Sequence, residues 1–262
     1  MTAPREAAKR VAYLAGALKT PRITEAASRL ADQARSDKWD YEDYLCAVLE
    51  REVSARAASG AELRIRAAGL PGRKTLEDFD FDVQPAARHE IGALASGAYL
   101  GEARNVVLLG PPGTGKTHLA IALAITAAHQ GHRVLFASAS EWVTRLSEAH
   151  RRDRLSAELA RLRRYPLLVV DEVGYLPFEQ EAANLFFQLV SSRYEHASIV
   201  LTSNLAFSGW ANVFGDQVVA AAMIDRIVHH ADVLTLKGAS YRLRGRGEET
   251  LPSVALTIEG AS

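Results

Sequence analysis

The sequence has little cysteine, no excess charge of either sign and no long apolar run. Cys46 is the only cysteine among 262 residues, which excludes an intrachain disulfide and favours a reducing compartment. The longest apolar stretch, Leu119 to Ala128, has about ten residues, whereas a membrane-spanning helix needs roughly 20. The first residues are charged and no apolar run follows them, so we expect no secretory signal there. These absences predict a cytoplasmic protein.

The charge is balanced overall but unevenly distributed. The chain carries 31 Lys and Arg against 31 Asp and Glu. Residues 1–75 hold 14 basic against 10 acidic side chains, residues 145–166 hold 7 against 3, and residues 237–247 hold 4 basic side chains and no acid. Because nucleic-acid binding depends on where the charge lies, the zero net charge does not exclude it.

Composition divides the chain into segments. Residues 1–70 are rich in Ala, Leu, Arg and Glu, with apolar residues at helical spacing, and predict a small all-helical domain for DNA or partner docking. Glycine and proline open a linker and lead-in segment, 71–104, with a helix expected over about 85–100. From 105 to 247 short apolar runs alternate with helical stretches, which predicts an α/β fold with a parallel sheet flanked by helices. Residues 248–262 form a tail. The expected strands are 106–109, 133–137, 167–171, 199–202 and 233–236.

The strongest motif is the glycine-rich turn GPPGTGKT, which follows a predicted strand and opens a predicted helix. It fits the G-x-x-x-x-G-K-[ST] pattern of a P-loop. Glycines let backbone N–H groups turn toward phosphates, and the helix N-terminus adds its positive end. Lys116 would contact the β- and γ-phosphates in catalysis, and the Thr117 hydroxyl would bind Mg²⁺. The predicted ATP-binding residues are Gly110, Pro111, Pro112, Gly113, Thr114, Gly115, Lys116 and Thr117.

Three side chains near this loop are less specific. We group His118 with the nucleotide-binding residues, in a packing or hydrogen-bonding role rather than as a base. Phe79 and Phe81 precede the loop in sequence, and they either contact the adenine or anchor the linker.

Polar residues end two further predicted strands. Asp171 and Glu172 follow four apolar residues, at the carboxyl end where open α/β sheets bind ligands. Asp171 would hold Mg²⁺, and Glu172 would polarise the attacking water as a general base. Asn204 ends the next strand, where its amide would orient water beside the γ-phosphate. The alternatives are a solvated strand end for the acids and a turn-forming role for the asparagine.

Strand, P-loop, helix, Asp-Glu and a strand ending in Asn resemble, in that order, the core of an AAA+ ATPase. The sequences of the motifs are more similar still to those of the IstB-type transposition helpers of bacterial insertion sequences, with DnaC-type helicase loaders as near relatives. The resemblance covers roughly residues 75–245. The motifs that carry it are GPPGTGKTHLAIALA at 110–124, YPLLVVDEVGYLPF at 165–178, LTSN at 201–204, VFGD at 213–216, AMIDRIVHH at 222–230 and KGASYRL at 237–243.

The resemblance implies two catalytic arginines beyond the P-loop. Arg226, in a D-R pair, would act as a finger on the nucleotide of a neighbouring subunit, and Arg242, in S-Y-R, would contact the nucleotide of its own subunit. An arginine supplied by a neighbour makes hydrolysis depend on a homo-oligomer. The alternatives are ordinary solvation or local pairing for Arg226 and a basic tail residue for Arg242.

Residues 141–165 are longer than a minimal core requires and contain two helical stretches. In the helicase-loader and initiator branch of the AAA+ proteins an extra helix here lines DNA. The phosphate-contact candidates are Arg145, Arg151, Arg152 and Arg154. Such contacts give affinity without reading sequence and weaken with salt. The alternative is a solvated face of a surface helix.

Three functions follow from these patterns. The first is an ATPase that assembles on duplex DNA in its ATP state and assists the transposase of the same element. The second is a DnaC-like helicase loader, which shares the core and differs in its N-terminal segment. The third, a small-molecule P-loop kinase, is disfavoured because a kinase would not need Asn204, Arg226 and Arg242 in that order.

Overall fold

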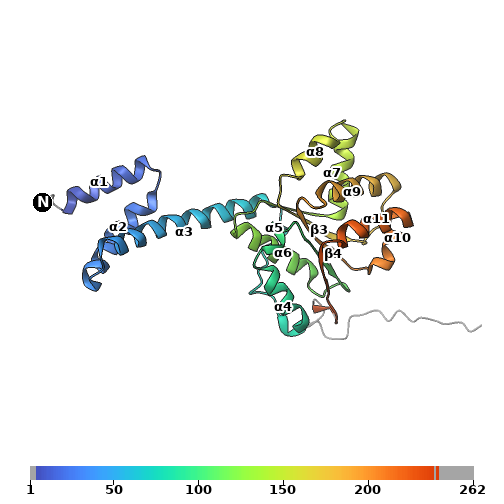
Figure 1. The fold of residues 1–262 in the computed structure, drawn as a ribbon, viewed down its shortest axis with the longest axis horizontal. Coiled ribbons are helices and arrows are strands. Elements are labelled where there is room, and N and C mark those ends of the chain that lie inside the picture. The colour runs from blue at the N-terminus through green and yellow to red at the C-terminus, as the bar shows by residue number, and fades with distance from the viewer. Residues whose placement is uncertain (1–3, 239, 242–262) are drawn as a thin grey trace, which may run out of the picture. The chain divides into compact units, whose positions relative to one another are not determined.

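The computed structural model describes residues 4–238, 240 and 241, and their contacts divide the chain into two units (Figure 1). One unit holds the chain up to Ala67 together with Ala128–His132, and the other holds Ala68–Ala127 and the chain from Arg133 onward. No helix of the described part is both long and apolar enough to cross a bilayer.

The N-terminal unit is helical, as the composition predicts. It consists of α1 (Pro4–Ala17), α2 (Pro21–Asp37) and α3 (Tyr41–Ala67). Pro21 occupies the first turn of α2, where a missing N–H costs nothing, and Lys38 ends that helix in a left-handed conformation, φ 54°. The small core between α2 and α3 is formed by Ala26, Leu30 and Val48, with Ile23, Tyr44 and Ala47 packed against it.

The second unit is built on the predicted parallel sheet, in the order β2-β3-β4-β1-β5. Its strands are β1 (Asn105–Leu109), β2 (Val134–Ser138), β3 (Leu167–Val173), β4 (Ser198–Ser203) and β5 (Ala231–Thr235). Its longer helices are α4 (Pro85–Leu94), α6 (Lys116–His129), α7 (Ala139–Arg151), α8 (Leu155–Leu162), α9 (Gln180–Arg193) and α11 (Gln217–Val228). Shorter helical turns are η1 (Phe81–Val83), α5 (Ala98–Gly101), η2 (Phe207–Gly209) and α10 (Trp210–Phe214).

Helices cover both faces of the sheet, because alternate residues of each buried strand point to opposite sides. Val107 and Leu168 belong to the core that faces α7, α9, α10 and α11. Val106 and Leu167, one residue earlier in each strand, belong to the core that faces α4, α5 and α6. The central strands are therefore buried on both sides, which explains why they read as mostly apolar runs.

The prediction of one continuous helix over about 85–100 is wrong. The structure has α4 and the short α5, separated by Gly97 in a left-handed conformation with φ 82°. Glycine adopts this conformation at little cost, so it ends one helix and starts another segment in a new direction. The two helical stretches expected within 141–165 are confirmed as α7 and α8.

A buried arginine fixes the starts of β3 and β4. Arg193, at the end of α9, is 1% exposed. Its guanidinium donates to the carbonyls of Leu162 (3.0 Å), Tyr165 (2.9 Å) and Ser198 (2.8 Å). Burial lowers the pKa of Arg193 to about 9, so the side chain is still charged at pH 7. One arginine side chain thus holds the segments that lead into the neighbouring strands β3 and β4.

Candidate nucleotide-binding and catalytic site

The three sequence motifs meet at one edge of the sheet. Gly110 follows β1, Asp171 lies near the end of β3, and Asn204 follows β4. These strands are neighbours in the order β3-β4-β1 and run parallel, so their carboxyl ends lie together. The Gly110 N–H donates to the Ser203 carbonyl at 3.2 Å, which joins the start of the P-loop to the end of β4.

The P-loop depends on two glycines with left-handed backbone. Gly113 has φ 81° and Gly115 has φ 96°. A Cβ on Gly115 would lie 2.5 Å from the Phe79 ring, and one on Gly113 would lie 2.0 Å from the Ser240 hydroxyl oxygen. Larger residues are therefore excluded by backbone conformation and by space, as in a loop that brings its backbone close to a ligand.

Lys116 opens α6 and points its ammonium group into the loop. Its Nζ donates to the carbonyls of Gly110 (2.6 Å) and Pro111 (2.8 Å), and the Thr114 hydroxyl donates to Pro111 at 2.8 Å. The cation thus lies beside the loop that leads into the N-terminus of α6. This combination suits a phosphate chain.

The best defined contact of the site joins α6 to β3. The Thr117 hydroxyl donates toward both carboxylate oxygens of Asp171, at 2.9 and 3.0 Å. Thr202, on β4, donates its hydroxyl to the same carboxylate at 2.5 Å. Asp171 is buried, 6% exposed, and accepts hydrogen bonds from these two hydroxyls. A carboxylate beside a hydroxyl offers the hard oxygen ligands that Mg²⁺ prefers, so the residues present fit that ion. Sequence reasoning assigned no role to Thr202.

Glu172 lies next to Asp171 but points elsewhere. Its backbone is left-handed, φ 62°, and the pairing of β3 with β4 shifts register between Val170 and Val173. Its N–H donates to the Thr202 hydroxyl oxygen at 2.9 Å, which holds the irregular backbone in place. As a result the Asp171 carboxylate is buried while the Glu172 side chain is exposed. A non-glycine residue in this conformation costs about 1–3 kcal/mol and is typical of functional sites.

Asn204 offers an unsatisfied polar atom at the same edge. Its Oδ1 is enclosed, and within the described chain it has no hydrogen-bond partner. Enclosed polar atoms are nearly always paired, so an orphan here indicates an amide available to a ligand or water.

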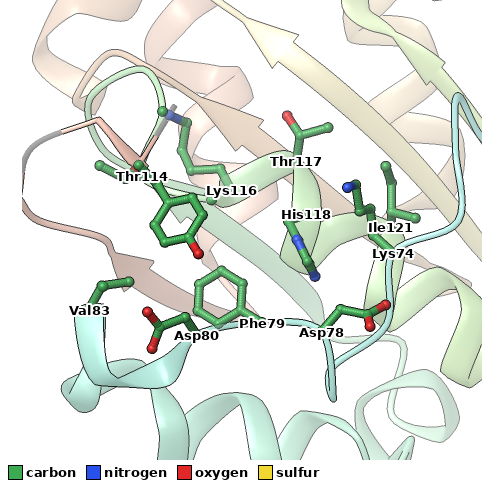
Figure 2. A pocket seen from close by; sticks show the side chains of 13 residues that line it. Lys74, Asp78, Phe79, Asp80, Val83, Thr114, Lys116, Thr117, His118 and Ile121 are labelled. Carbon is green, nitrogen blue, oxygen red and sulfur yellow. The ribbon is translucent and has the colours of Figure 1, made fainter. Parts of the chain in front are cut away.

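A cavity of about 630 Å³ adjoins the P-loop (Figure 2). Phe79, Lys116, Thr117 and His118 lie around it in Figure 2, with Asp78 and Asp80 on the chain segment that precedes η1. The lining residues that sequence reasoning did not identify are Lys74, Asp78, Asp80, Val83, Ile121 and Tyr241. Phe79, His118 and the loop residues were the candidates here, because no motif marks the four lining residues of the lead-in segment, and Ile121 and Tyr241 carry no ligand chemistry of their own in the motifs that contain them.

The side chains near the loop divide into two roles. His118 Nε2 lies 2.8 Å from the Thr75 carbonyl oxygen, and the ring packs edge-on against Phe79 at 5.2 Å. His118 is therefore a hydrogen-bonding and packing residue that also lines the cavity. Phe81 is absent from the described lining and lies 5.5 Å under the Arg88 guanidinium, as a linker anchor.

Neither of the two arginines that the resemblance implies is among the described residues that line this cavity. Arg226, on α11, places its guanidinium 4.4 Å from the centre of the Phe187 ring and is half-buried. It is not among the described residues that line the cavity of its own chain. Arg242 lies outside the described residues.

The candidate DNA-binding arginines lie on the α7–α8 hairpin. Arg145 pairs with Glu158 at 2.5 Å and lies over the Trp142 ring at 5.4 Å. The other three candidates are exposed around the turn between the helices; these are Arg151, Arg152 and Arg154. The structure thus brings the four arginines into one hairpin but gives Arg145 a partner inside the fold.

Comparison with known proteins agrees with this geometry. A profile of the family described as IstB-like ATP binding protein matches residues 13–249. A protein named as the ATP-binding protein of insertion sequence IS21, from Pseudomonas aeruginosa, is 45% identical over 87% of this chain and 86% of its own length. The corresponding protein of insertion sequence IS5376, from Geobacillus stearothermophilus, is 38% identical over 87% of this chain and 91% of its own length.

Solved structures share the fold. The DnaC helicase loader matches with a TM-score of 0.52 and 21% identity, over 66% of this chain and 99% of its own. AMPPCP-bound DnaA from Aquifex aeolicus matches with a TM-score of 0.55 and 21% identity, over 67% of this chain and 54% of its own. The predicted α/β fold of an AAA+ P-loop core with a helical N-terminal region is thus confirmed. The chain belongs to the IstB-like family of ATP-binding proteins.

Proposed function

We propose that this chain hydrolyses ATP to ADP and phosphate with Mg²⁺ held by Thr117 and Asp171. The observation that carries the proposal is the contact of the Thr117 hydroxyl with both Asp171 oxygens, at 2.9 and 3.0 Å, one residue after Lys116. Bound Mg²⁺ would neutralise phosphate charge. Thr202 would keep the Asp171 carboxylate oriented through its 2.5 Å hydrogen bond.

The remaining roles follow from position. Lys116 would exchange its two carbonyl acceptors for phosphate oxygens, because a charged acceptor makes the stronger hydrogen bond. The exposed carboxylate of Glu172 would accept a proton from the attacking water. Asn204 would orient that water through its Oδ1, which has no hydrogen-bond partner within the described residues.

Catalysis would require a second copy of the chain. Arg226 lines no part of the described cavity of its own subunit, which supports a role at a neighbour's nucleotide. Its place over the Phe187 ring would hold the guanidinium ready to act. Arg242 would contact the nucleotide of its own subunit. The active form is therefore proposed to be a homo-oligomer in the ATP state, in the cytoplasm.

The proposed target of that assembly is duplex DNA, and the proposed partner is the transposase of the same insertion element. Insertion-sequence relatives at 45% and 38% identity support this function. The helicase-loader alternative has the fold alone in its support, at 21% identity. The exposed arginines of the hairpin would contact phosphates without reading the base sequence.

Sedimentation of the full chain with duplex DNA tests this proposal. With ATP and Mg²⁺ we expect multimers on DNA, and Glu172→Gln should hold them there because ATP binds but is not cleaved. Glu179→Gln, an exposed acid at the start of α9, is the matched control and should behave as the wild type. Rapid ATP turnover by Glu172→Gln would remove that residue from the mechanism, and a chain that stays monomeric with ATP and DNA would refute the assembly.

A further inference from the structure

A second cluster of metal-ligand side chains lies near the amino ends of β4 and β5, opposite the ends of the strands that carry the P-loop site. Glu195 follows α9, and His229 and His230 join α11 to β5. One ligand atom of each lies within 4.8 Å of the other two, and the described residues contain no other group of three with this property. None of them lines the nucleotide cavity.

The backbone brings these side chains together from two distant segments. The chain turns sharply after α9, with Glu195 left-handed at φ 57° and the His196 N–H donating to the Arg193 carbonyl at 2.9 Å. On the other side, the Asn105 N–H of β1 donates to the His230 carbonyl at 2.8 Å. The turn thus fixes the backbone at Glu195, and the hydrogen bond to β1 anchors the segment of His229 and His230 to the buried sheet.

We propose that Glu195, His229 and His230 bind a divalent transition-metal ion, with Zn²⁺ as the best match. Imidazole and carboxylate together suit Zn²⁺, and bonds of about 2.0–2.1 Å place tetrahedral ligands about 3.4 Å apart. His230 Nε2 and Glu195 Oε1 are 3.8 Å apart already. The two imidazole rings have centroids 4.2 Å apart and planes at 68°, so they do not stack. Small rotations of exposed side chains complete the site.

A neighbouring tyrosine orients one of the ligands. The Tyr194 hydroxyl lies 2.8 Å from His229 Nδ1, and the two rings are 5.8 Å apart. Hydrogen bonds of this kind hold a metal-binding imidazole in position, and losing one typically weakens metal binding about 10–100-fold. Tyr194 is therefore a positioning residue, and the three protein ligands leave one coordination position open.

Titration of the full chain with ZnCl₂, followed by calorimetry, tests the site. The protein is first stripped with a chelator and then held in excess Mg²⁺, which occupies the oxygen ligands of the nucleotide site. We expect one Zn²⁺ per wild-type chain, loss of that binding in His230→Ala and Glu195→Gln, and about tenfold weaker binding in Tyr194→Phe. His89→Ala, an exposed histidine on α4, is the matched control and should keep the binding.

Two results would overturn the proposal. One is a wild-type chain that binds no Zn²⁺, and the other is equal Zn²⁺ affinity and stoichiometry in wild type, His230→Ala and Glu195→Gln. The ligands are exposed, so the variants should fold, and unchanged ATP binding by each variant checks this. Since the readout is metal binding alone, the result does not depend on whether the chain hydrolyses ATP.

Discussion

The Thr117 hydroxyl lies 2.9 and 3.0 Å from the two carboxylate oxygens of Asp171, although 54 positions separate the residues in the chain. Thr117 lies in the first turn of α6, directly after the P-loop, and Asp171 lies near the end of the buried strand β3. Their meeting turns two separate motifs into one site of oxygen ligands.

The first prediction concerns this contact. Asp171→Asn removes the charge that would hold Mg²⁺, and we expect ATP affinity in Mg²⁺ to fall about 10–100-fold, the size of a lost charged hydrogen bond of about 1.5–3 kcal/mol. Thr117→Ser keeps the hydroxyl and should stay close to the wild type. Fluorescent ATP binding with Mg²⁺ and with a chelator measures both. Equal loss with and without Mg²⁺ would show that Asp171 acts on folding rather than on the ion.

The second prediction concerns the arginine that lies over the Phe187 ring. Arg226→Ala should keep ATP binding and lose about 10³-fold or more in hydrolysis, as other supplied arginines do. Mixing gives a sharper measurement. Arg226→Ala chains retain a P-loop, and Lys116→Ala chains retain the finger, so a mixture should recover hydrolysis that neither variant shows alone. No recovery in the mixture, with mixed multimers formed, would contradict a role across subunits.

The third prediction separates the arginines of the α7–α8 hairpin. Arg151→Ala, Arg152→Ala and Arg154→Ala should each make the dependence of log affinity on log salt shallower by about 0.9. Arg145→Ala should change this slope little, because Arg145 pairs with Glu158, and should cost about 1 kcal/mol of stability. DNA binding over a salt series measures the slopes. Arg88→Ala on α4 is the control, and an unchanged slope in all three turn variants would move the DNA surface elsewhere.

The position of a candidate site residue could be predicted where the residue belongs to a motif of consecutive residues. The P-loop and Asp171 follow apolar strands, so both the motif and its place at the sheet edge can be read directly. The Thr202 hydrogen bond to Asp171 could not be read, because it depends on which residues of β3 and β4 face each other. The left-handed backbone of Glu172 lies at the same register shift, and no sequence pattern predicts it.

The fold shows the same division. Alternation of apolar runs and helices predicts the parallel sheet, since its central strands β1, β3 and β4 are buried on both faces. The break between α4 and α5 was missed because Gly97 lies within an otherwise helical pattern, and a single glycine does not always end a helix. The cavity-lining side chains of Asp78 and Tyr241 reach the P-loop through chain folding alone.

The last prediction concerns a buried carboxylate in the N-terminal unit. Glu52 is 5% exposed, accepts the Arg22 N–H at 2.9 Å and pairs with Arg56 at 2.7 Å. Burial raises the pKa of Glu52, but the hydrogen bonds from Arg56 and Arg22 outweigh it and hold the pKa below its ordinary value of 4.5. The folded state therefore binds this proton less readily than the unfolded state, so Glu52 stabilises the fold at neutral pH. That stabilisation is lost as the pH falls below 4.5 and through the folded-state pKa.

Glu52→Gln tests this dependence. The variant should be less stable than the wild type at pH 7, and the difference should shrink as the pH falls through the folded-state pKa of Glu52, because both side chains are then neutral. Urea unfolding of the full chain, followed by far-ultraviolet circular dichroism at several pH values, gives the two curves. Glu25→Gln is the matched control, since the Glu25 side chain is 71% exposed and should contribute little at any pH. A Glu52→Gln deficit that stays constant across the acid range would mean that the side chain contributes through packing and not through its charge.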